Sequence, residues 1–365
     1  MVHSAADHSY QEYLNTHHFG SLDGLRFICI AAVIWHHGLL WQHLIGFSPI
    51  FGRGYTGVDF FFVLSGFLIT TLLLRERSKK GQFDLRGFYW RRVLRIVPVY
   101  FLVVTVAGVL AALRASETAE LLPFYYLFLS NFLTEHIPLL TVTWSLSMEE
   151  QYYLVWPVLL MLLPARWAIP VLVGFVAVNL AAVLGALAPL GIHPAWAGPL
   201  RFAMPASTYA PLLMGSLAAI LLHQPHWFDR ISPLLAPRIM PWLLFTALAA
   251  VLANWPEGLA GWPNLLMHAL MTLILMSLVV REDNGMHRIL CFAPIARVGQ
   301  ISYGIYLYHL FALSAVVKIL RPVGLENQIA IMIIYPALAV FVAEISFRTY
   351  ERWFLGLRHK GLGRV

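Results

Sequence analysis

Apolar segments separated by short polar connections recur along all 365 residues of the chain. A helix that crosses a bilayer needs about 20 mostly apolar residues, and the longer segments meet this length. The pattern predicts spanning helices at about 22–45, 55–74, 96–113, 144–163, 167–188, 205–222, 239–255, 262–280, 302–320 and 328–348. We therefore expect an all-α polytopic membrane protein whose single membrane domain covers residues 1–365.

One further apolar segment, Leu121 to Leu133, is shorter and rich in aromatic side chains. Its length is small for a full crossing, and aromatic residues favour the boundary between hydrocarbon and water. We expect this segment to form a re-entrant or interfacial helix on the extracytoplasmic side of the bundle.

Charge fixes the expected orientation. The chain is 59% hydrophobic and 12% charged, with a net charge of +7. With ten spans, twenty of the 25 lysine and arginine residues lie on one side of the membrane. The positive-inside rule assigns that side, with both termini, to the cytoplasm. Because the basic residues lie between apolar segments, we expect contact with membrane lipid and no nucleic-acid binding. The N-terminus has no basic start and no small-residue cleavage site, so no removable signal is expected.

The first predicted span carries Arg26 and His37, and ionisable groups within hydrocarbon usually serve function. Eleven residues make about three turns plus 20°, so both side chains share one helix face about 16 Å apart along the axis. We interpret them as a pair, with Arg26 near one membrane surface and His37 near mid-depth. His36 lies about 80° from Arg26 on the same helix and is expected to pack or to form hydrogen bonds.

Asp59 lies near the outer end of the second predicted span. A histidine of the first span is its simplest partner, because a carboxylate on one ring nitrogen leaves the other nitrogen as a base. The alternative is an interfacial Asp59 that caps its helix at Gly57 and Val58. Ser65 is expected to be a small residue at a helix contact, with a nucleophilic role as the alternative.

Arg91, Arg92 and Arg95 are spaced three and four residues apart where the third span begins, which predicts an arginine face. Guanidinium groups bind phosphate oxygens in bidentate fashion, so this face suits a phosphorylated ligand. The alternative is an orientation signal that is attracted to anionic lipid headgroups.

Two adjacent carboxylates, Glu149 and Glu150, open the fourth span, and His309 lies within the ninth. Adjacent helical residues point about 100° apart, so at most one of the two carboxylates faces any one cavity. Structural polar packing is the alternative for both carboxylates and for His309. Neither an HExxH sequence nor a histidine and cysteine set at ligand spacing is evident, so no metal is expected.

Four strings, taken together with Arg26 and His37, resemble acyltransferase family 3, the bacterial membrane-bound O-acyltransferases. The strings are GVDFFFVLSGFLI at 57–69, FYWRRVLRIVPVY at 88–100, WSLSMEEQYYLVWP at 144–157 and ISYGIYLYHLF at 301–311. They follow one another in order, and the resemblance covers about residues 20–350.

The resemblance implies a ten-helix enzyme of the bacterial cytoplasmic membrane. Such an enzyme moves an acyl group, usually acetyl, from cytoplasmic acyl-CoA to a hydroxyl group, commonly of an extracytoplasmic glycan. It matches His37 to the family's essential histidine, Arg26 to its paired arginine and Glu149 to its essential glutamate, with Glu150 as the adjacent candidate. Arg92 and Arg95 match the RxxR motif of the CoA side. Some relatives carry a C-terminal esterase-like domain, whereas this chain ends at Val365, so we expect it to act alone or with a separate partner.

Our mechanistic hypothesis is that His37, oriented by Asp59 or Glu149, removes the acceptor's hydroxyl proton as it attacks the thioester. A covalent acyl-histidine is the alternative route. Acylation of a small hydroxylated molecule, such as a macrolide, is the alternative substrate class. A transporter or flippase is the rival function, although the chain lacks the paired halves that many transporters show. The residues assign neither the acceptor nor the oligomeric state.

Overall fold

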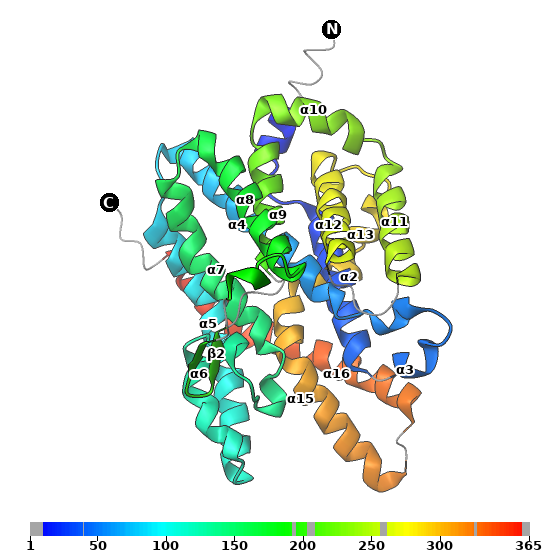
Figure 1. Ribbon diagram of the computed structural model, residues 1–365. Coiled ribbons are helices and arrows are strands. Elements are labelled where there is room, and N and C mark those ends of the chain that lie inside the picture. The colour runs from blue at the N-terminus through cyan, green and yellow to red at the C-terminus, as the bar shows by residue number, and fades with distance from the viewer. Residues whose placement is uncertain are drawn as a thin grey trace.

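The computed structural model describes residues 10–38, 40–191, 195–202, 209–255, 261–324 and 327–359. These residues form a bundle of helices around a central helix, α4 (Thr56–Lys80), as Figure 1 shows. Helices from distant parts of the sequence pack around α4, namely α2 (Gly20–His37), α7 (Thr143–Leu162), α9 (Tyr209–Leu222) and α12 (Trp262–Val280). The candidate residues of α2, α4 and α7 are therefore brought to one interior.

The other long helices complete the bundle. They are α5 (Leu85–Leu113), α8 (Ala165–Val183), α10 (Pro225–Leu235), α11 (Met240–Asn254), α15 (Ser302–Leu320) and α16 (Gln328–Ser346). Short helices connect them: α3 (Trp41–Leu44), η1 (Pro49–Gly52), η4 (Pro138–Leu140), η5 (Ala188–Leu190), α13 (His287–Leu290), α14 (Ala293–Gln300), η6 (Arg321–Val323), η7 (Phe347–Glu351), α17 (Arg352–Gly356) and η8 (Leu357–His359).

Each of the ten predicted spans overlaps a helix, although residue 39 of the first and residues 205–208 of the sixth lie outside the described residues. Five helices among the described residues are long and apolar enough to cross a membrane: Thr56–Lys80, Leu85–Leu113, Trp262–Val280, Ser302–Leu320 and Gln328–Gly356. The α10 and α11 pair, bent by 77°, gives a sixth if it forms one span. The chain is thus a helical membrane protein, and the count of ten spans stays a prediction.

Helix α2 ends at His37, earlier than the sequence pattern indicates. Trp41 Nε1 donates a hydrogen bond to the His36 carbonyl at 2.7 Å, which satisfies one of the free carbonyls at the helix end. A Cβ atom on Gly38 would lie 2.3 Å from Met332 Sδ, so glycine leaves room for this side chain of α16. The chain then turns into α3. His37 therefore sits at a helix terminus.

Two glycines set the distance between α4 and α9. A Cβ atom on Gly66 would lie 1.9 Å from the Leu212 carbonyl oxygen, and one on Gly215 would lie 2.1 Å from the Val63 oxygen. Small residues let helix backbones approach closely in this way. Ser216 Oγ adds a hydrogen bond of 3.0 Å to the Gly66 carbonyl. This contact fixes the rotation of α4, which carries Asp59 and Ser65.

The segment from Leu121 to Leu133 forms only short helices. They are η2 (Glu117–Leu121), α6 (Leu122–Tyr126) and η3 (Ser130–Phe132). Tyr125 is fully buried, and its hydroxyl accepts a hydrogen bond from the Ile137 backbone N–H at 3.0 Å. The segment is therefore folded against the bundle, while its re-entrant or interfacial position in a bilayer stays a prediction.

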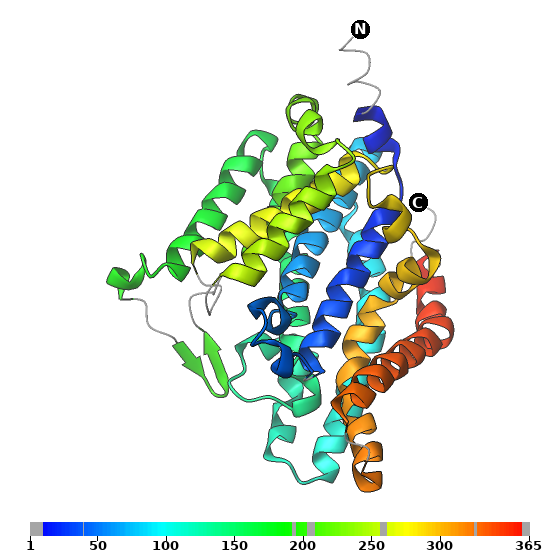
Figure 2. The same cartoon turned by 90° about the vertical axis from the view of Figure 1, so that its right-hand side faces the viewer.

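A small antiparallel hairpin departs from the expected all-α architecture. Strands β1 (Ala195–Ala197) and β2 (Leu200–Phe202) pair through a tight turn, and they project beside the helices in Figure 2. Gly198 in the turn has a φ of +58°, a conformation that glycine adopts without strain. The signal for the turn was the Gly198 and Pro199 pair between two apolar runs.

Candidate active site

A cavity of about 370 Å³ opens beside the end of α2. Two residues named from the sequence, His37 of α2 and Asp59 of α4, line the same cavity. Its full lining is Val33, His36, His37, Tyr55, Val58, Asp59, Thr141, Val142, Trp144, Asn264 and Tyr306. The cavity thus combines an imidazole, a carboxylate and a phenol with apolar walls.

The hydrogen bonding of His37 defines its tautomer. Its Nδ1 lies 2.8 Å from the backbone oxygen of Val33, one turn earlier in α2. A carbonyl oxygen only accepts, so Nδ1 carries the proton of the neutral ring. The Nε2 atom then holds a lone pair, which is the state that a general base needs.

A second histidine lies against the first. The ring centroids of His37 and His309 are 4.8 Å apart, with the planes at 66°. His309 is fully buried, its Nδ1 lies 2.7 Å from the Tyr306 carbonyl oxygen, and its Nε2 is buried with no hydrogen-bond partner among the residues that the structure describes. The two rings present a pair of imidazoles from α2 and α15 in the interior of the bundle.

The partner of Asp59 is a histidine that the sequence interpretation did not name. His268 Nε2 of α12 lies 3.4 Å from Asp59 Oδ1, and the His268 side chain is only 1% exposed. The Gly57 and Val58 N–H groups donate to backbone carbonyls, so Asp59 does not cap the helix there. The available signal for His268 was an isolated histidine within the apolar segment 262–280.

Glu149 is held between two hydroxyl groups. Ser65 Oγ of α4 donates to Glu149 Oε1 at 2.7 Å, and the Tyr153 hydroxyl donates to Oε2 at 3.2 Å. Arg92 interacts electrostatically with Glu149 and with the adjacent Glu150. Ser65 is therefore a hydrogen-bond donor to Glu149 as well as a neighbour of the α4–α9 contact.

Arg26 contacts groups near the start of α2 and is not bonded to His37. Its Nη1 donates to Asp23 Oδ1 at 2.8 Å, while Gln300 Nε2 donates to Asp23 Oδ2 at 3.0 Å. Asp23 is 2% exposed, so these donors compensate a buried carboxylate. Along the continuous helix, Arg26 and His37 are about 16 Å apart.

The predicted arginine face divides in the structure. Arg95 interacts electrostatically with Arg26, Arg92 and Glu351. Many protein atoms lie around the Arg95 side chain, but part of its surface is accessible to solvent. Arg92 lies over the Tyr153 ring, 5.1 Å from its centroid. Arg91 instead pairs with Glu76, with Nη2 3.3 Å from Oε2. Arg26, Arg92 and Arg95 therefore form a basic cluster near the start of α2.

Comparison with known protein families identifies the class of this membrane protein. Residues 19–347 match the model of an acyltransferase domain family, and the chain belongs to this family. No solved structure matches the chain.

Curated relatives include a peptidoglycan O-acetyltransferase of Listeria monocytogenes, OatA, which is 30% identical over 91% of this chain and 55% of its own length. A Bacillus subtilis protein, YrhL, is also named as a peptidoglycan O-acetyltransferase and is 27% identical over 85% of this chain and 49% of its own length. A Staphylococcus aureus protein named as an O-acetyltransferase is 24% identical over 94% and 58%. The chain thus spans about half the length of these relatives.

Proposed function

We propose that this protein is a membrane O-acyltransferase that moves an acyl group, most simply acetyl, from cytoplasmic acyl-CoA to a hydroxyl group of an extracytoplasmic or membrane-associated glycan. Family membership and relatives named as peptidoglycan O-acetyltransferases support this chemistry and this class of acceptor. The observation that carries the proposal is the hydrogen bond from His37 Nδ1 to the Val33 carbonyl, because it leaves Nε2 as a base at a cavity.

The reaction balances with His37 as the only proton carrier. The acceptor oxygen attacks the thioester carbonyl carbon while His37 Nε2 takes the hydroxyl proton. The new C–O bond forms, the C–S bond breaks, and His37 returns its proton to the departing CoA thiolate. The products are an ester and free CoA thiol, and the histidine is neutral again.

The basic cluster of Arg26, Arg92 and Arg95 is proposed to hold the phosphates of the donor. Guanidinium groups suit phosphate oxygens, and the accessible surface of Arg95 leaves room for a ligand. The axial distance of about 16 Å between Arg26 and His37 calls for an extended donor, and the pantetheine arm of CoA is a long flexible chain. We place the cluster on the cytoplasmic side, with both termini.

Glu149 is proposed to link the two ends of the site. It interacts electrostatically with Arg92 and also with Tyr306, which lines the cavity with His37. Asp59 is proposed to act with His268 in shaping the acceptor side of the cavity, since His268 Nε2 lies 3.4 Å from Asp59 Oδ1. Glu150 is proposed to help position Arg92, with which it interacts electrostatically. Arg91, which bonds Glu76, is proposed to help hold the start of α5.

The direct and covalent routes differ in a single kinetic observation. An acyl-histidine intermediate requires a burst of free CoA in the absence of acceptor. We favour direct transfer, so we expect no burst when purified protein is mixed rapidly with acetyl-CoA alone. A burst equal to the enzyme concentration, lost on His37→Ala substitution, would instead establish the covalent route.

The experiment that tests the function uses purified protein in nanodiscs, labelled acetyl-CoA and glycan acceptors, with a macrolide as the small-molecule control. We expect label to appear as an alkali-labile ester on the glycan. Label on the macrolide alone would change the acceptor class. Folded protein that releases no thiol from acetyl-CoA or longer acyl-CoAs with any acceptor would favour a transporter.

A further inference from the structure

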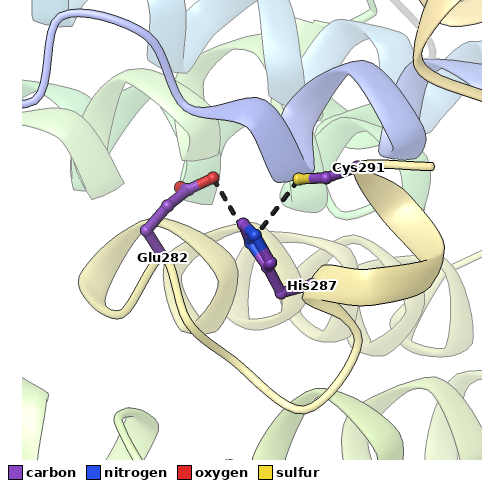
Figure 3. Close-up of side chains that lie close together, drawn as sticks. All are labelled: Glu282, His287 and Cys291. Atoms are coloured by element: carbon purple, nitrogen blue, oxygen red, sulfur yellow. Dashed lines mark hydrogen bonds and ion pairs between the residues drawn. The ribbon is translucent and has the colours of Figure 1, made fainter. Parts of the chain in front are cut away.

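A compact group of three metal-ligating side chains lies outside the cavity, in the connection that follows α12. Glu282, His287 and Cys291 place their ligand atoms within 4.8 Å of one another, and Figure 3 shows the three side chains converging. His287 and Cys291 are four residues apart on one helical turn, so they share a face, while Glu282 approaches from the preceding loop. We propose that these residues form a zinc site.

The distances are compatible with a shared ion. His287 Nδ1 lies 3.5 Å from Cys291 Sγ and 3.9 Å from Glu282 Oε1, and the second distance exceeds a hydrogen bond. Zinc bonds of about 2.3 Å to sulfur and about 2.0–2.2 Å to nitrogen and oxygen give tetrahedral edges of roughly 3.4–3.6 Å. The histidine and cysteine are already at this edge length, whereas the carboxylate must move closer, by about half an ångström relative to His287.

The donor set selects the metal. A thiolate and an imidazole favour zinc over magnesium or calcium, which prefer oxygen ligands. A carboxylate and a thiolate together supply two negative charges, so Zn²⁺ neutralises the site. On binding, the Cys291 thiol gives its proton to solvent as the zinc–sulfur bond forms. Three protein ligands leave the fourth tetrahedral position for water.

The surrounding contacts orient the ligands. The Ser21 backbone N–H donates to Glu282 Oε1 at 3.1 Å, while Glu282 Oε2 is buried and has no hydrogen-bond partner in the described part of the chain. A Cβ atom on Gly20 would lie 3.0 Å from Cys291 Sγ and 3.2 Å from Glu282 Oε1, so glycine keeps this space open. The first turn of α2 therefore forms one wall of the site.

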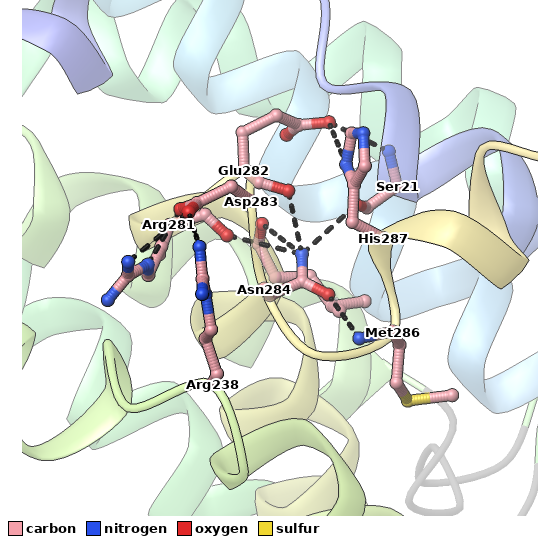
Figure 4. Close-up of polar contacts among 9 residues, drawn as sticks. Ser21, Arg238, Arg281, Glu282, Asp283, Asn284, Met286 and His287 are labelled. Atoms are coloured by element: carbon pink, nitrogen blue, oxygen red, sulfur yellow. Dashed lines mark hydrogen bonds and ion pairs between the residues drawn. The ribbon is translucent and has the colours of Figure 1, made fainter.

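The loop that carries Glu282 is fixed by a buried asparagine. Asn284 is 5% exposed, and its Nδ2 donates to Ser21 Oγ at 3.1 Å and to the Glu282 carbonyl at 3.2 Å, as Figure 4 shows. Its Oδ1 accepts from the Met286 N–H at 3.0 Å. These bonds tie the loop to α2 and set the backbone on both sides of the ligands, as outer-shell contacts do in metal sites.

The neighbouring acidic residue is already committed elsewhere. Asp283 pairs with Arg281 and Arg238, each with a nitrogen 2.6 Å from a carboxylate oxygen (Figure 4). These guanidinium groups hold the pKa of the Asp283 carboxyl well below its ordinary value. Glu282 is therefore the one of the two adjacent carboxylates that turns toward His287.

The test measures alkylation of the two cysteines in the purified protein after treatment with a chelator. Cys29 is 1% exposed and serves as an internal reference. Mass spectrometry then gives the alkylation rate of Cys291 relative to that of Cys29. We expect one equivalent of Zn²⁺ to slow alkylation of Cys291 at least about tenfold, while Mg²⁺ has no effect. Equal rates with and without Zn²⁺ would overturn the site.

Variants separate the ligands from the fold. His287→Ala and Glu282→Gln are each expected to weaken Zn²⁺ protection of Cys291 by about tenfold or more, whereas His226→Ala, at an exposed histidine, retains full protection. Protection that persists in both ligand variants would contradict the proposal. If a variant does not fold, the wild-type protein is titrated with Co²⁺ and its absorption spectrum is recorded. Coordination by the Cys291 thiolate gives a charge-transfer band, and the absence of this band would contradict the site.

Discussion

The rings of His37 and His309 lie 4.8 Å apart, centroid to centroid, although 272 residues separate them in the sequence. Each ring directs Nδ1 to a backbone carbonyl, His37 to Val33 and His309 to Tyr306. Both neutral rings therefore have their lone pair on Nε2. This arrangement fixes the orientation of the proposed base without a carboxylate.

His309→Phe tests whether the buried histidine positions His37. Phenylalanine keeps a ring edge against His37 and removes both nitrogens. We predict that kcat falls about 10- to 100-fold while KM for acetyl-CoA is unchanged. The control is Tyr308→Phe, because Tyr308 is the adjacent residue of α15 and its hydroxyl bonds Ser346 of α16. A rise in KM without a fall in kcat would assign His309 to donor binding instead.

Asp59 and His268 are predicted to be energetically coupled. Asp59→Asn and His268→Leu each remove one partner of the 3.4 Å contact. Because the two groups are in contact and His268 is buried, we expect a coupling free energy of about 0.5–3 kcal/mol in a double-mutant cycle of unfolding. Additive effects would show that Asp59 is an independent polar residue at the cavity.

Ser65→Ala distinguishes a hydrogen-bond donor from a nucleophile. The serine donates to Glu149 at 2.7 Å, so its loss should destabilise the protein by about 1.5–3 kcal/mol. We predict that purified Ser65→Ala keeps measurable acetyl transfer, whereas Glu149→Ala loses more activity. Loss as complete as that of His37→Ala, in folded protein, would make Ser65 the nucleophile.

Arg95→Ala tests the donor-binding end. Losing a charged hydrogen bond worth about 1.5–3 kcal/mol should raise KM for acetyl-CoA about 10- to 100-fold. Acetyl-pantetheine lacks the phosphates, so its KM should not change. Arg166→Ala, at an exposed position of α8, is the matched control. An equal effect on both donors would argue for a structural or lipid-related role of Arg95.

Asp84 gives a pH-dependent prediction at the start of the arginine-bearing helix α5. Its carboxylate accepts from the Gly87 N–H at 2.8 Å as the N-cap, and this bond, with help from Lys80, lowers the pKa of Asp84. Asp84→Ala should cost about 1 kcal/mol at pH 7.

The sign follows from linkage, because a carboxyl with a lowered folded-state pKa stabilises above its ordinary pKa of about 3.9. We expect the stability difference between wild type and Asp84→Ala to hold from pH 7 to about 5 and to shrink below about 4. Asp84→Asn retains the cap and should lose less stability. A difference that stays constant down to acidic pH would refute the charged cap.

The apolar pattern located the helices well because length and hydropathy are local properties of the sequence. It extended the first span to residue 45, whereas α2 ends at His37, where Gly38 lies against side chains of the distant helix α16 that the local pattern does not encode. The hairpin at β1 and β2 likewise lay in a segment too short to give a strand pattern.

In the site, too, features within one helix could be predicted from the sequence, whereas contacts between helices could not. The spacing predicted that Arg26 and His37 share one helix face, and the structure adds partners from α2 itself and from other helices. Asp23 and Gln300 hold the first end, and His309 lies against the second. Partners across helices depend on packing, which no single segment encodes, and so His268 was not named.

The measurement that tests the central claim most directly compares free-thiol release from acetyl-CoA, with acceptor present, by wild type, His37→Ala and His43→Ala in nanodiscs. His43 is an exposed histidine of α3 and serves as the control. We predict that His37→Ala lowers kcat about 10²- to 10⁴-fold, as expected for loss of a general base, while His43→Ala retains wild-type activity. Folded His37→Ala protein with undiminished thiol release and acetyl transfer would contradict His37 as the catalytic base.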